Sequence, residues 1–393
     1  MNKLCLVVQR YGMEVNGGAE LLCRQIAEHL VEYYDIDVVT TKAIDYMSWK
    51  DEYTDDNEII NGVNVIRFNV TKERNMDSFN LINGQFLAGN FTSIEEEHKW
   101  IDEQGPYAPK IIDYIKDNQE KYDAFLFFTY LYYPTVRGVK EVSDKAIVFS
   151  FAHDEPYIYM NVFNDVFEKA RAFYFCTNEE RQFIRNKYHN YDIPYIIGGA
   201  GVDVPKVVSG DNFKQKYGLD NYIIYVGRID DGKNCKELFD HFFKYKKRNN
   251  SNLKLVLLGK AVIPVPESED IVSLGFVPEQ DKFDGIAGSK CLILPSHFES
   301  LSIVILEAFE LKIPIIVDGH CEVTKGHCIK SNGGFYYMNY YEFEEELKML
   351  TTDSALNKKM GECGNKYVSE NYKWDIIISK LRGLIDRITG ENG

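Results

Sequence analysis

Residues 222–234 read Tyr222-Ile223-Ile224-Tyr225-Val226-Gly227-Arg228-Ile229-Asp230-Asp231-Gly232-Lys233-Asn234. The apolar start of this segment is typical of a buried β-strand, and the glycine at 227 ends it. Two basic residues then follow in a loop, before a helix that the apolar spacing predicts over 236–245. Continuous apolar strands alternating with amphipathic helices indicate a parallel, doubly wound α/β sheet covered on both faces.

The same alternation occupies most of the chain. We expect strands at 4–8, 36–40, 63–68, 125–128, 146–151, 172–176, 253–258, 290–294 and 313–317. Helices are expected at 19–33, 109–118, 179–187 and 303–311. Residues 71–101 are polar with few strand signals, so we expect an irregular insertion or a mobile loop there.

The strand and helix series restarts after a turn-rich stretch at 198–205. We therefore expect one Rossmann-like domain over 1–205 and a second over 206–373. Residues 374–393 form an amphipathic helical segment that we expect to return toward the first domain. Two such domains facing each other would place a ligand cleft at the carboxyl ends of both sheets.

Composition excludes several classes of protein. The 45 basic and 60 acidic residues give a formal net charge of −15, which argues against nucleic acid as the main partner. No apolar run reaches the length of about 18 residues needed for a membrane span, and the apolar run at the N-terminus is too short for a signal peptide. The eight scattered cysteines are expected to be buried free thiols of a cytoplasmic protein.

The strongest motif is a pair of glutamates, Glu299 and Glu307, eight positions apart. Glu299 lies in the loop that opens a helix, and Glu307 lies about two turns into it. Such carboxylates would accept hydrogen bonds from hydroxyls of a polyol, with the helix N-terminus favouring a phosphate or sugar oxygen between them. An acidic residue complementing the helix dipole, plus an unrelated surface glutamate, is an equally good interpretation.

Arg228 and Lys233 form the second motif, at the carboxyl end of the strand 222–226. Two cations there would neutralise a diphosphate, the guanidinium as a planar fork and the ammonium as a point charge. The alternative is that both are solvated residues paired with Asp230 and Asp231.

Two weaker signals lie in the first domain. Gly17-Gly18 follows the first strand and would let the backbone approach a ligand closely, although a plain turn explains it as well. His153 follows the strand 146–151 and would hydrogen-bond a sugar hydroxyl, although a histidine satisfied by local backbone is the commoner case.

Together these segments resemble the retaining glycosyltransferases of family 4, which have the GT-B fold, and in particular a bacterial branch of that family. The spacing Glu299 to Glu307 matches the family's E-x7-E motif, and Gly227-Arg228 with Lys233 matches its G-R…K pair. Gly17-Gly18-Ala19-Glu20 matches its G-G-x-E loop, and His153 its first-domain histidine. The resemblance covers nearly the whole chain.

The resemblance implies a role for each motif. Arg228 and Lys233 would bind the diphosphate of a sugar nucleotide, and Glu299 would hold the hydroxyls of the transferred sugar. The backbone N–H groups of Ser300, Leu301 and Ser302 would lie beside that sugar. Many relatives have glycines at these three positions, so side chains turned inward here would narrow the sugar pocket.

The remaining implied roles concern the nucleotide and the first domain. Glu307 would bind the ribose of the nucleotide, and Gly227 would end the strand beside it. Gly17 and Gly18 would approach the phosphate or the acceptor from the acceptor-side domain, where His153 also lies. No metal or other cofactor is expected, because cationic side chains stand where other sugar transferases use a divalent ion.

The resulting hypothesis is transfer from a nucleoside-diphosphate sugar to a glycan, a lipid-linked saccharide or a protein, in bacterial surface polysaccharide or glycolipid assembly. A cytoplasmic protein with possible peripheral contact at the inner face of a membrane fits the composition. A catalytically silent sugar-nucleotide-binding subunit and a sugar-nucleotide epimerase of the same fold are the alternatives.

Two further patterns have simpler interpretations than a functional site. The triplets Gly319-His320-Cys321 and Gly326-His327-Cys328 offer four zinc-type ligands, but adjacent His-Cys pairs do not easily converge on one tetrahedral centre. Tyr130, Tyr132 and Tyr133 would stack on an acceptor sugar, but core packing explains them at least as well.

Overall fold

The computed structural model describes residues 2–15, 17–91 and 93–390. The chain divides into two compact units. Unit 1 comprises Met1–Gly199 and Asp375–Gly393, and unit 2 comprises Ala200–Trp374. Each unit is described by itself.

Unit 1 is built on an eight-stranded sheet with the order β3-β4-β2-β1-β5-β6-β7-β8. All neighbouring strands are parallel except β3 and β4, which form an antiparallel pair at the edge. The strands are β1 (Lys3–Val7), β2 (Asp35–Thr41), β3 (Asn57–Ile60), β4 (Val63–Phe68), β5 (Ala124–Phe128), β6 (Ala146–Phe149), β7 (Ala172–Phe175) and β8 (Tyr195–Ile197).

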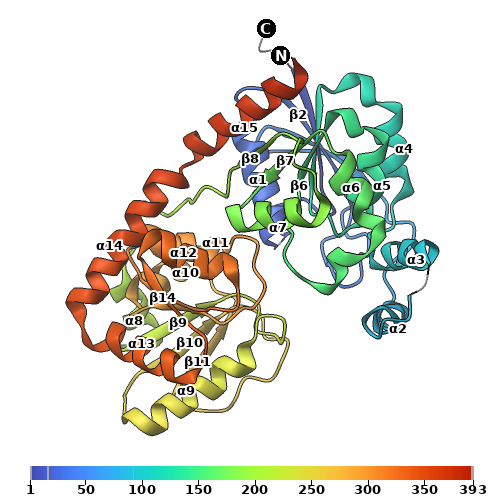
Figure 1. The fold of residues 1–393 in the computed structure, drawn as a ribbon. Helices are drawn as coiled ribbons and strands as arrows, with labels where there is room; N and C mark the ends of the chain where they lie inside the picture. Colours follow the sequence, from blue (N-terminus) through green and yellow to red (C-terminus); the bar gives the residue numbers. More distant parts are fainter. Residues whose placement is uncertain (1, 16, 92, 391–393) are drawn as a thin grey trace. The chain divides into compact units, whose positions relative to one another are not determined.

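Helices cover both faces of this sheet, which is why β5, β6 and β7 are buried along their whole length. Figure 1 shows α4, α5 and α6 on one side and α1 and α15 on the other. The helices are α1 (Gly18–Leu30), α2 (Met76–Leu87), α3 (Ile94–Gln104), α4 (Pro109–Asp117), α5 (Tyr133–Gly138), α6 (Asn164–Lys169) and α7 (Asn178–Tyr188). Five short 3-10 turns lie at Gln119–Lys121, Val139–Glu141, Ser143–Lys145, Pro156–Tyr159 and Asn161–Phe163.

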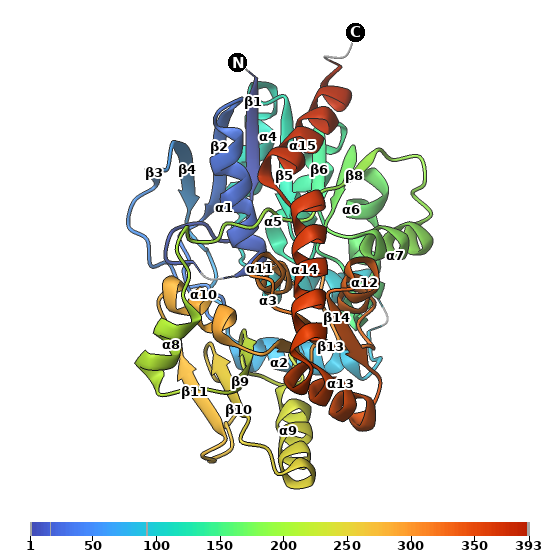
Figure 2. The ribbon, with the colours of Figure 1, turned by 90° about the vertical axis from the view of Figure 1, so that its left-hand side faces the viewer.

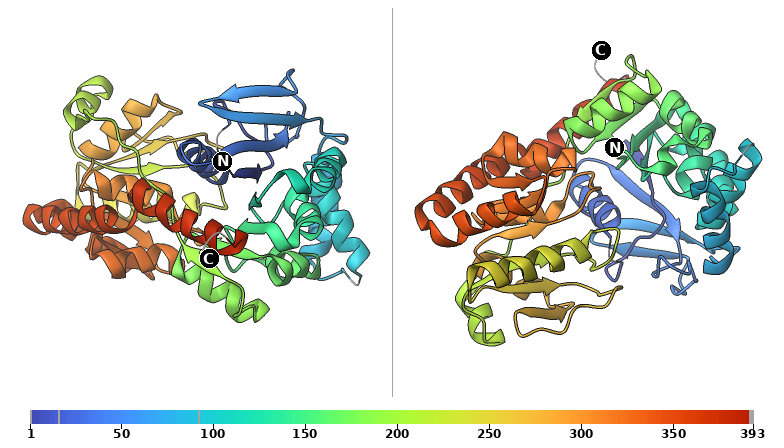
Figure 3. Two further views of the ribbon diagram at one scale, coloured as in Figure 1. Left: turned by 90° about the horizontal axis from the view of Figure 1, so that it is seen from above. Right: turned by 60° about the horizontal axis from the view of Figure 1, so that its bottom comes forward.

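The expectation of an irregular segment at 71–101 is wrong. This part of unit 1 holds α2 and the start of α3, which pack together at its edge (Figure 3). Asn75 caps α2 by accepting the N–H of Ser78, and Ser93 forms a reciprocal capping box with Glu96. Trp100, only 1% exposed, anchors α3 in the core, so burial of few apolar side chains is enough to order the segment.

Unit 2 is built on a fully parallel six-stranded sheet with the order β11-β10-β9-β12-β13-β14. Its strands are β9 (Tyr222–Val226), β10 (Lys254–Leu258), β11 (Ile271–Gly275), β12 (Leu292–Leu294), β13 (Ile315–Asp318) and β14 (Gly334–Tyr337). The helices are α8 (Gly210–Tyr217), α9 (Cys235–Asn249), α10 (Glu279–Gly288), α11 (Ile303–Glu310), α12 (Glu322–Ser331), α13 (Tyr340–Thr352) and α14 (Ser354–Asn371). Figures 1 and 2 show α9 and α13 on one face of the sheet and α10, α11 and α12 on the other.

The last helix, α15 (Trp374–Thr389), begins at the final residue of unit 2 and continues in unit 1. In unit 2, the Trp374 Nε1 donates to Asp203 Oδ2 at 2.9 Å. In unit 1, the Lys380 Nζ donates to the carbonyl of Ile197 at 3.3 Å, and the Arg382 guanidinium lies 3.9 Å from the centre of the Tyr33 ring. The predicted amphipathic segment thus forms a helix with a buried apolar face of Ile377, Ile378, Leu381, Leu384 and Ile385.

The structure confirms the doubly wound α/β architecture in both units. Every strand predicted above is present, with ends shifted by at most two residues. The four strands that the pattern did not predict, β3, β8, β11 and β14, all have partly or fully exposed positions and are not buried along their whole length. All eight cysteines are free, and all but Cys363 are buried.

Candidate functional site

The end of β9 is shaped by two glycines. Gly227 has a φ of +153°, and the neighbouring Gly259 after β10 has a φ of +138°. A Cβ on Gly259 would lie 2.0 Å from the carbonyl oxygen of Gly227, so only glycine permits the two strand ends to approach this closely. The chain leaves the sheet at this point and forms the loop 228–234.

Asp230 organises this loop. Its carboxylate forms an ion pair with the Arg228 guanidinium and accepts the backbone N–H of Lys233 at 2.8 Å. Arg228 itself is 44% exposed along its side chain. The structure therefore shows the ion pair of Arg228 with Asp230 that the sequence offered as an alternative. Asp231 pairs with Lys236 and not with Lys233.

Lys233 joins the two motifs of unit 2. Its Nζ lies 2.6 Å from Glu299 Oε1, across 66 residues of sequence. The side chains are 30% and 12% exposed, respectively. The pair places a cation and a carboxylate together at the carboxyl end of the sheet, both reachable by solvent.

The loop that carries Glu299 is fixed through its backbone. The carbonyl of Leu301 accepts from His327 Nε2 on α12 at 2.8 Å, and Ser302 has a left-handed φ of +64°. Leu301 is buried, whereas Ser300 and Ser302 are half-buried. Leu301 would therefore meet a ligand through its main chain only, and the two serines are the side chains that replace the relatives' glycines.

Glu307 lies on α11 and does not contact Glu299. It is buried, and its Oε1 lies 2.6 Å from Lys282 Nζ on α10. Burial raises the pKa of Glu307, and the Lys282 ammonium opposes that rise. The sequence analysis missed Lys282, because one lysine on a short polar helix carries no distinguishing pattern.

In unit 1, the two glycines after β1 differ in their surroundings. A Cβ on Gly17 would lie 2.2 Å from Glu20 Oε2, which is held by a buried ion pair with Arg10 at 2.6 Å. Among the described residues, no atom lies within 4 Å of a Cβ on Gly18. Gly17 is thus required by local packing, while Gly18 borders open space.

His153 follows β6 and is positioned by a carboxylate that the sequence analysis missed. Glu180 on α7, which is 2% exposed, accepts from Ser150 Oγ at 2.6 Å, Ala152 N at 2.8 Å and Cys176 N at 2.7 Å. The His153 side chain is 26% exposed, and its Nε2 lies 3.5 Å from Glu155 Oε2.

The remaining candidates have structural partners. Tyr130 is 1% exposed and donates to Glu155 Oε1 at 2.7 Å, which agrees with the core interpretation. The two Gly-His-Cys triplets do not supply one set of ligands. His327 bonds to Leu301, as described above, whereas His320 Nδ1 faces Asp318 Oδ1 at 2.7 Å.

Comparison with known proteins identifies chains of similar sequence. Residues 210–367 match the family described as glycosyl transferases group 1, which covers most of unit 2. Glycosyltransferase 1 domain-containing protein 1 of Xenopus tropicalis is 22% identical over 247 residues, covering 57% of this chain and 69% of that protein.

Several solved structures share the fold over nearly the whole chain. Sucrose-phosphate synthase from Thermosynechococcus elongatus superimposes with a TM-score of 0.74 at 13% identity and 100% coverage of both chains. Anabaena Alr3699/HepE, in complex with UDP and glucose, gives 0.71 at 13% identity, covering 98% of this chain and 100% of that one. WaaG, a glycosyltransferase involved in lipopolysaccharide biosynthesis, gives 0.64 at 13% identity with the same coverage.

The protein is therefore a glycosyltransferase with the GT-B fold. Residues 210–367, which match the model of group 1 glycosyl transferases, contain Arg228, Lys233, Glu299 and Glu307. Among the residues that the structure describes, no helix is long and apolar enough to cross a membrane.

Proposed function

We propose that the protein is a retaining glycosyltransferase of family 4 that moves a sugar from a nucleoside-diphosphate sugar to an acceptor hydroxyl without a metal ion. The observation that carries this proposal is the contact between Lys233 and Glu299, with Arg228 on the same loop. Cations that grip a diphosphate and a carboxylate that grips a sugar would then lie side by side, as a sugar nucleotide requires.

In this proposal the diphosphate binds to the guanidinium of Arg228 and the ammonium of Lys233. The phosphate would compete with Glu299 for Lys233, which leaves carboxylate lone pairs of Glu299 to accept hydroxyls of the sugar. The same cations stabilise negative charge on the departing nucleoside diphosphate, where a transferase needs its largest electrostatic contribution.

The transfer step needs only the donor and the acceptor as reactants. The bond between the anomeric carbon and the phosphate oxygen breaks, and a bond to the acceptor oxygen forms on the same face of the sugar. The acceptor's proton passes to an oxygen of the leaving phosphate, so no protein nucleophile is needed. This differs from the paired-carboxylate double displacement of retaining glycosidases.

Glu307 is proposed to bind the ribose hydroxyls, with Lys282 holding its carboxylate in place. Gly18 and His153 are proposed to serve the phosphate or the acceptor from unit 1. Gly18 borders open space, and the backbone before His153 is fixed by Glu180. These assignments follow the family resemblance together with the local geometry.

Two fold relatives support a choice of substrates. Alr3699/HepE binds UDP and glucose, and WaaG acts in lipopolysaccharide biosynthesis. We therefore propose a uridine nucleotide sugar as the first donor to test, and a saccharide of a bacterial surface polysaccharide or glycolipid as acceptor. The cytoplasm, or the inner face of its membrane, is the proposed location.

A ligand panel tests the function directly. Nucleoside diphosphates and their sugars are screened by thermal shift, because a ligand that binds only the native state raises the melting temperature. We expect one nucleoside diphosphate, and a sugar of that same nucleotide, to stabilise the protein.

Product analysis with that donor should then show transfer to an acceptor saccharide, and activity should persist in a chelator. Stabilisation without transfer or donor hydrolysis over long incubation would instead support a binding subunit. Complete loss in chelator, restored by a divalent ion, would contradict metal-independent transfer.

A further inference from the structure

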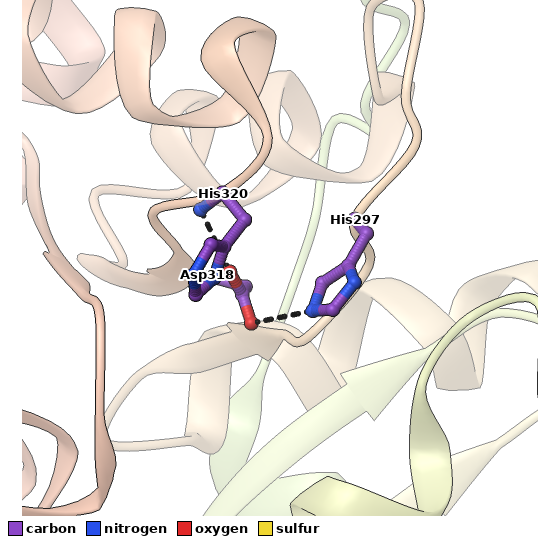
Figure 4. A group of neighbouring side chains, drawn as sticks. All are labelled: His297, Asp318 and His320. Atoms are coloured by element: carbon purple, nitrogen blue, oxygen red, sulfur yellow. Dashed lines mark hydrogen bonds and ion pairs between the residues drawn. The ribbon is translucent and has the colours of Figure 1, made fainter. Parts of the chain in front are cut away.

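A buried carboxylate at the end of β13 is faced by two imidazoles (Figure 4). Asp318 is 1% exposed. Its Oδ2 lies 3.1 Å from His297 Nε2, and its Oδ1 lies 2.7 Å from His320 Nδ1. The two histidine side chains are 41% and 52% exposed, so the group is closed on the carboxylate side and open to solvent on the other.

The two histidines come from two loops of unit 2, and Asp318 is the last residue of β13. His297 lies in the loop between β12 and α11, and His320 lies in the loop between β13 and α12. One potential ligand atom from each residue lies within 4.8 Å of the others, and the two ring centres are 5.3 Å apart. Among the residues that the structure describes, this is the one group of its kind.

The spacing suits a tetrahedral metal centre. Bonds of about 2.0–2.2 Å to imidazole nitrogen and carboxylate oxygen place neighbouring ligand atoms about 3.3 Å apart. The two imidazole nitrogens face different oxygens of Asp318, at 3.1 and 2.7 Å, and the three candidate ligand atoms lie within 4.8 Å of one another. Small side-chain rotations would therefore seat an ion among the three ligands.

We propose that His297, Asp318 and His320 bind a divalent transition-metal ion, with zinc as the best match. Two imidazoles and one carboxylate are a ligand set that zinc accepts, whereas magnesium and calcium prefer oxygen alone. Three protein ligands leave a fourth position, on the solvent side, for water. Asn234 Nδ2 also lies 3.1 Å from His297 Nε2 and would give up this contact when that nitrogen binds the ion.

The ion would cross-link the two loops rather than take part in transfer. His297 stands two residues before Glu299, so fixing its ring would restrain the loop that carries the sugar-binding carboxylate. This site does not depend on the proposed transfer reaction, because its ligands are separate from Arg228, Lys233 and Glu299.

Calorimetric titration of the full, chelator-treated chain with Zn²⁺ tests the site, with a phosphine reductant keeping the thiols reduced. We expect one ion per chain and a rise in melting temperature on loading. His297→Ala and His320→Ala should each weaken binding at least about tenfold, the lower end of what loss of a supporting partner costs at such sites. His189→Asn is the matched control, because it removes an exposed imidazole of unit 1. Asparagine tolerates the left-handed backbone conformation at this position.

Co²⁺ provides a test that needs no variant. Co²⁺ bound at this site should give the visible absorption bands expected for a cobalt ion with nitrogen and oxygen ligands. It should give no charge-transfer band from a thiolate. A thiolate band would assign the ion to a cysteine and overturn the proposal. The absence of Zn²⁺ binding, or equal affinity in the wild type and both histidine variants, would also overturn it.

Discussion

The two units each place a carboxylate beside a loop at the end of a parallel strand, but they use it differently. In unit 1, Glu180 is buried and accepts three hydrogen bonds from Ser150, Ala152 and Cys176. In unit 2, Glu299 is partly exposed, and its carboxylate accepts from the ammonium of Lys233.

The difference distinguishes a carboxylate that fixes a loop from a carboxylate that is available to bind a ligand. A carboxylate that already accepts two backbone N–H groups and a serine hydroxyl has little capacity left for a ligand and serves to fix the loop. A carboxylate paired with one flexible cation can exchange that partner for a hydroxyl, while the cation turns to a phosphate. Substitutions at the two sites should therefore affect different properties, stability in unit 1 and catalysis in unit 2.

The largest effect on activity is expected from Lys233→Ala. Loss of the ammonium removes a contact to the diphosphate and leaves Glu299 unpaired, so kcat/KM should fall at least about 100-fold, as when a charge-stabilising donor is removed. The measurement is steady-state transfer together with nucleoside-diphosphate binding.

Lys236→Ala is the control for Lys233, because its ammonium pairs with the exposed Asp231 in the loop before α9. It should retain activity within about threefold, as expected for a surface pair. Unchanged kinetics in Lys233→Ala would remove this residue from the proposed site.

Glu180→Gln should chiefly lower stability. The amide keeps one acceptor oxygen and presents an NH₂ group to donors, so the free energy of unfolding should fall by about 2 kcal/mol. Urea denaturation measures it, with the exposed Glu168→Gln on α6 as control. A variant as stable as the wild type would contradict the supporting role.

The pH dependence sharpens the same comparison. Burial raises the pKa of Glu180 from 4.5 to about 7, against the opposing effect of its hydrogen bonds. The folded state then binds this proton more tightly than the unfolded state, so its contribution to stability falls as pH rises from about 4.5 to 7. The stability difference between wild type and Glu180→Gln should be larger at pH 5.5 than at pH 7.5.

Within unit 2, Glu299→Ala and Glu307→Ala should have opposite signatures. The first should reduce discrimination between sugar nucleotides about tenfold and change nucleoside-diphosphate affinity little, because one hydrogen-bonded charged contact to the sugar is lost. The second should weaken nucleoside-diphosphate affinity about tenfold, for the same reason at the ribose. Competition kinetics with two donors and calorimetry separate them, and the reverse pattern would exchange the two assignments.

The smallest effects are expected at the paired glycines. Gly17→Ala would collide with Glu20 and should lower the melting temperature, because the Arg10 ion pair holds that carboxylate in place. Gly18→Ala meets no atom of the residues that the structure describes and should leave stability intact. Any loss of transfer in Gly18→Ala then reports a ligand approaching this backbone, and full activity would remove Gly18 from the proposed site.

The sequence predicted the architecture well because both sheets are largely parallel and buried. Runs such as Tyr222–Val226 are continuous and apolar, so their period and length identify them as strands. The apolar pattern did not predict the helices within residues 71–101, because few of the apolar side chains there are buried. The Ser93 to Glu96 capping box was the available signal for a helix start, and it was overlooked.

The partners within each site were harder to foresee. Motif spacing identified Lys233 and Glu299 separately, but only the fold brings their charged atoms to 2.6 Å. Lys282 and Glu180 act through contacts between helices or loops distant in sequence, and neither has a local pattern. His320 was considered with Cys321, whereas its neighbours in space are Asp318 and His297.

A crystal structure of the protein with its nucleotide sugar tests the central claim most directly. The account predicts diphosphate oxygens within hydrogen-bonding distance of the Arg228 guanidinium and the Lys233 ammonium, with sugar hydroxyls on the Glu299 carboxylate. A sugar nucleotide bound elsewhere, with these three side chains facing solvent, would contradict it.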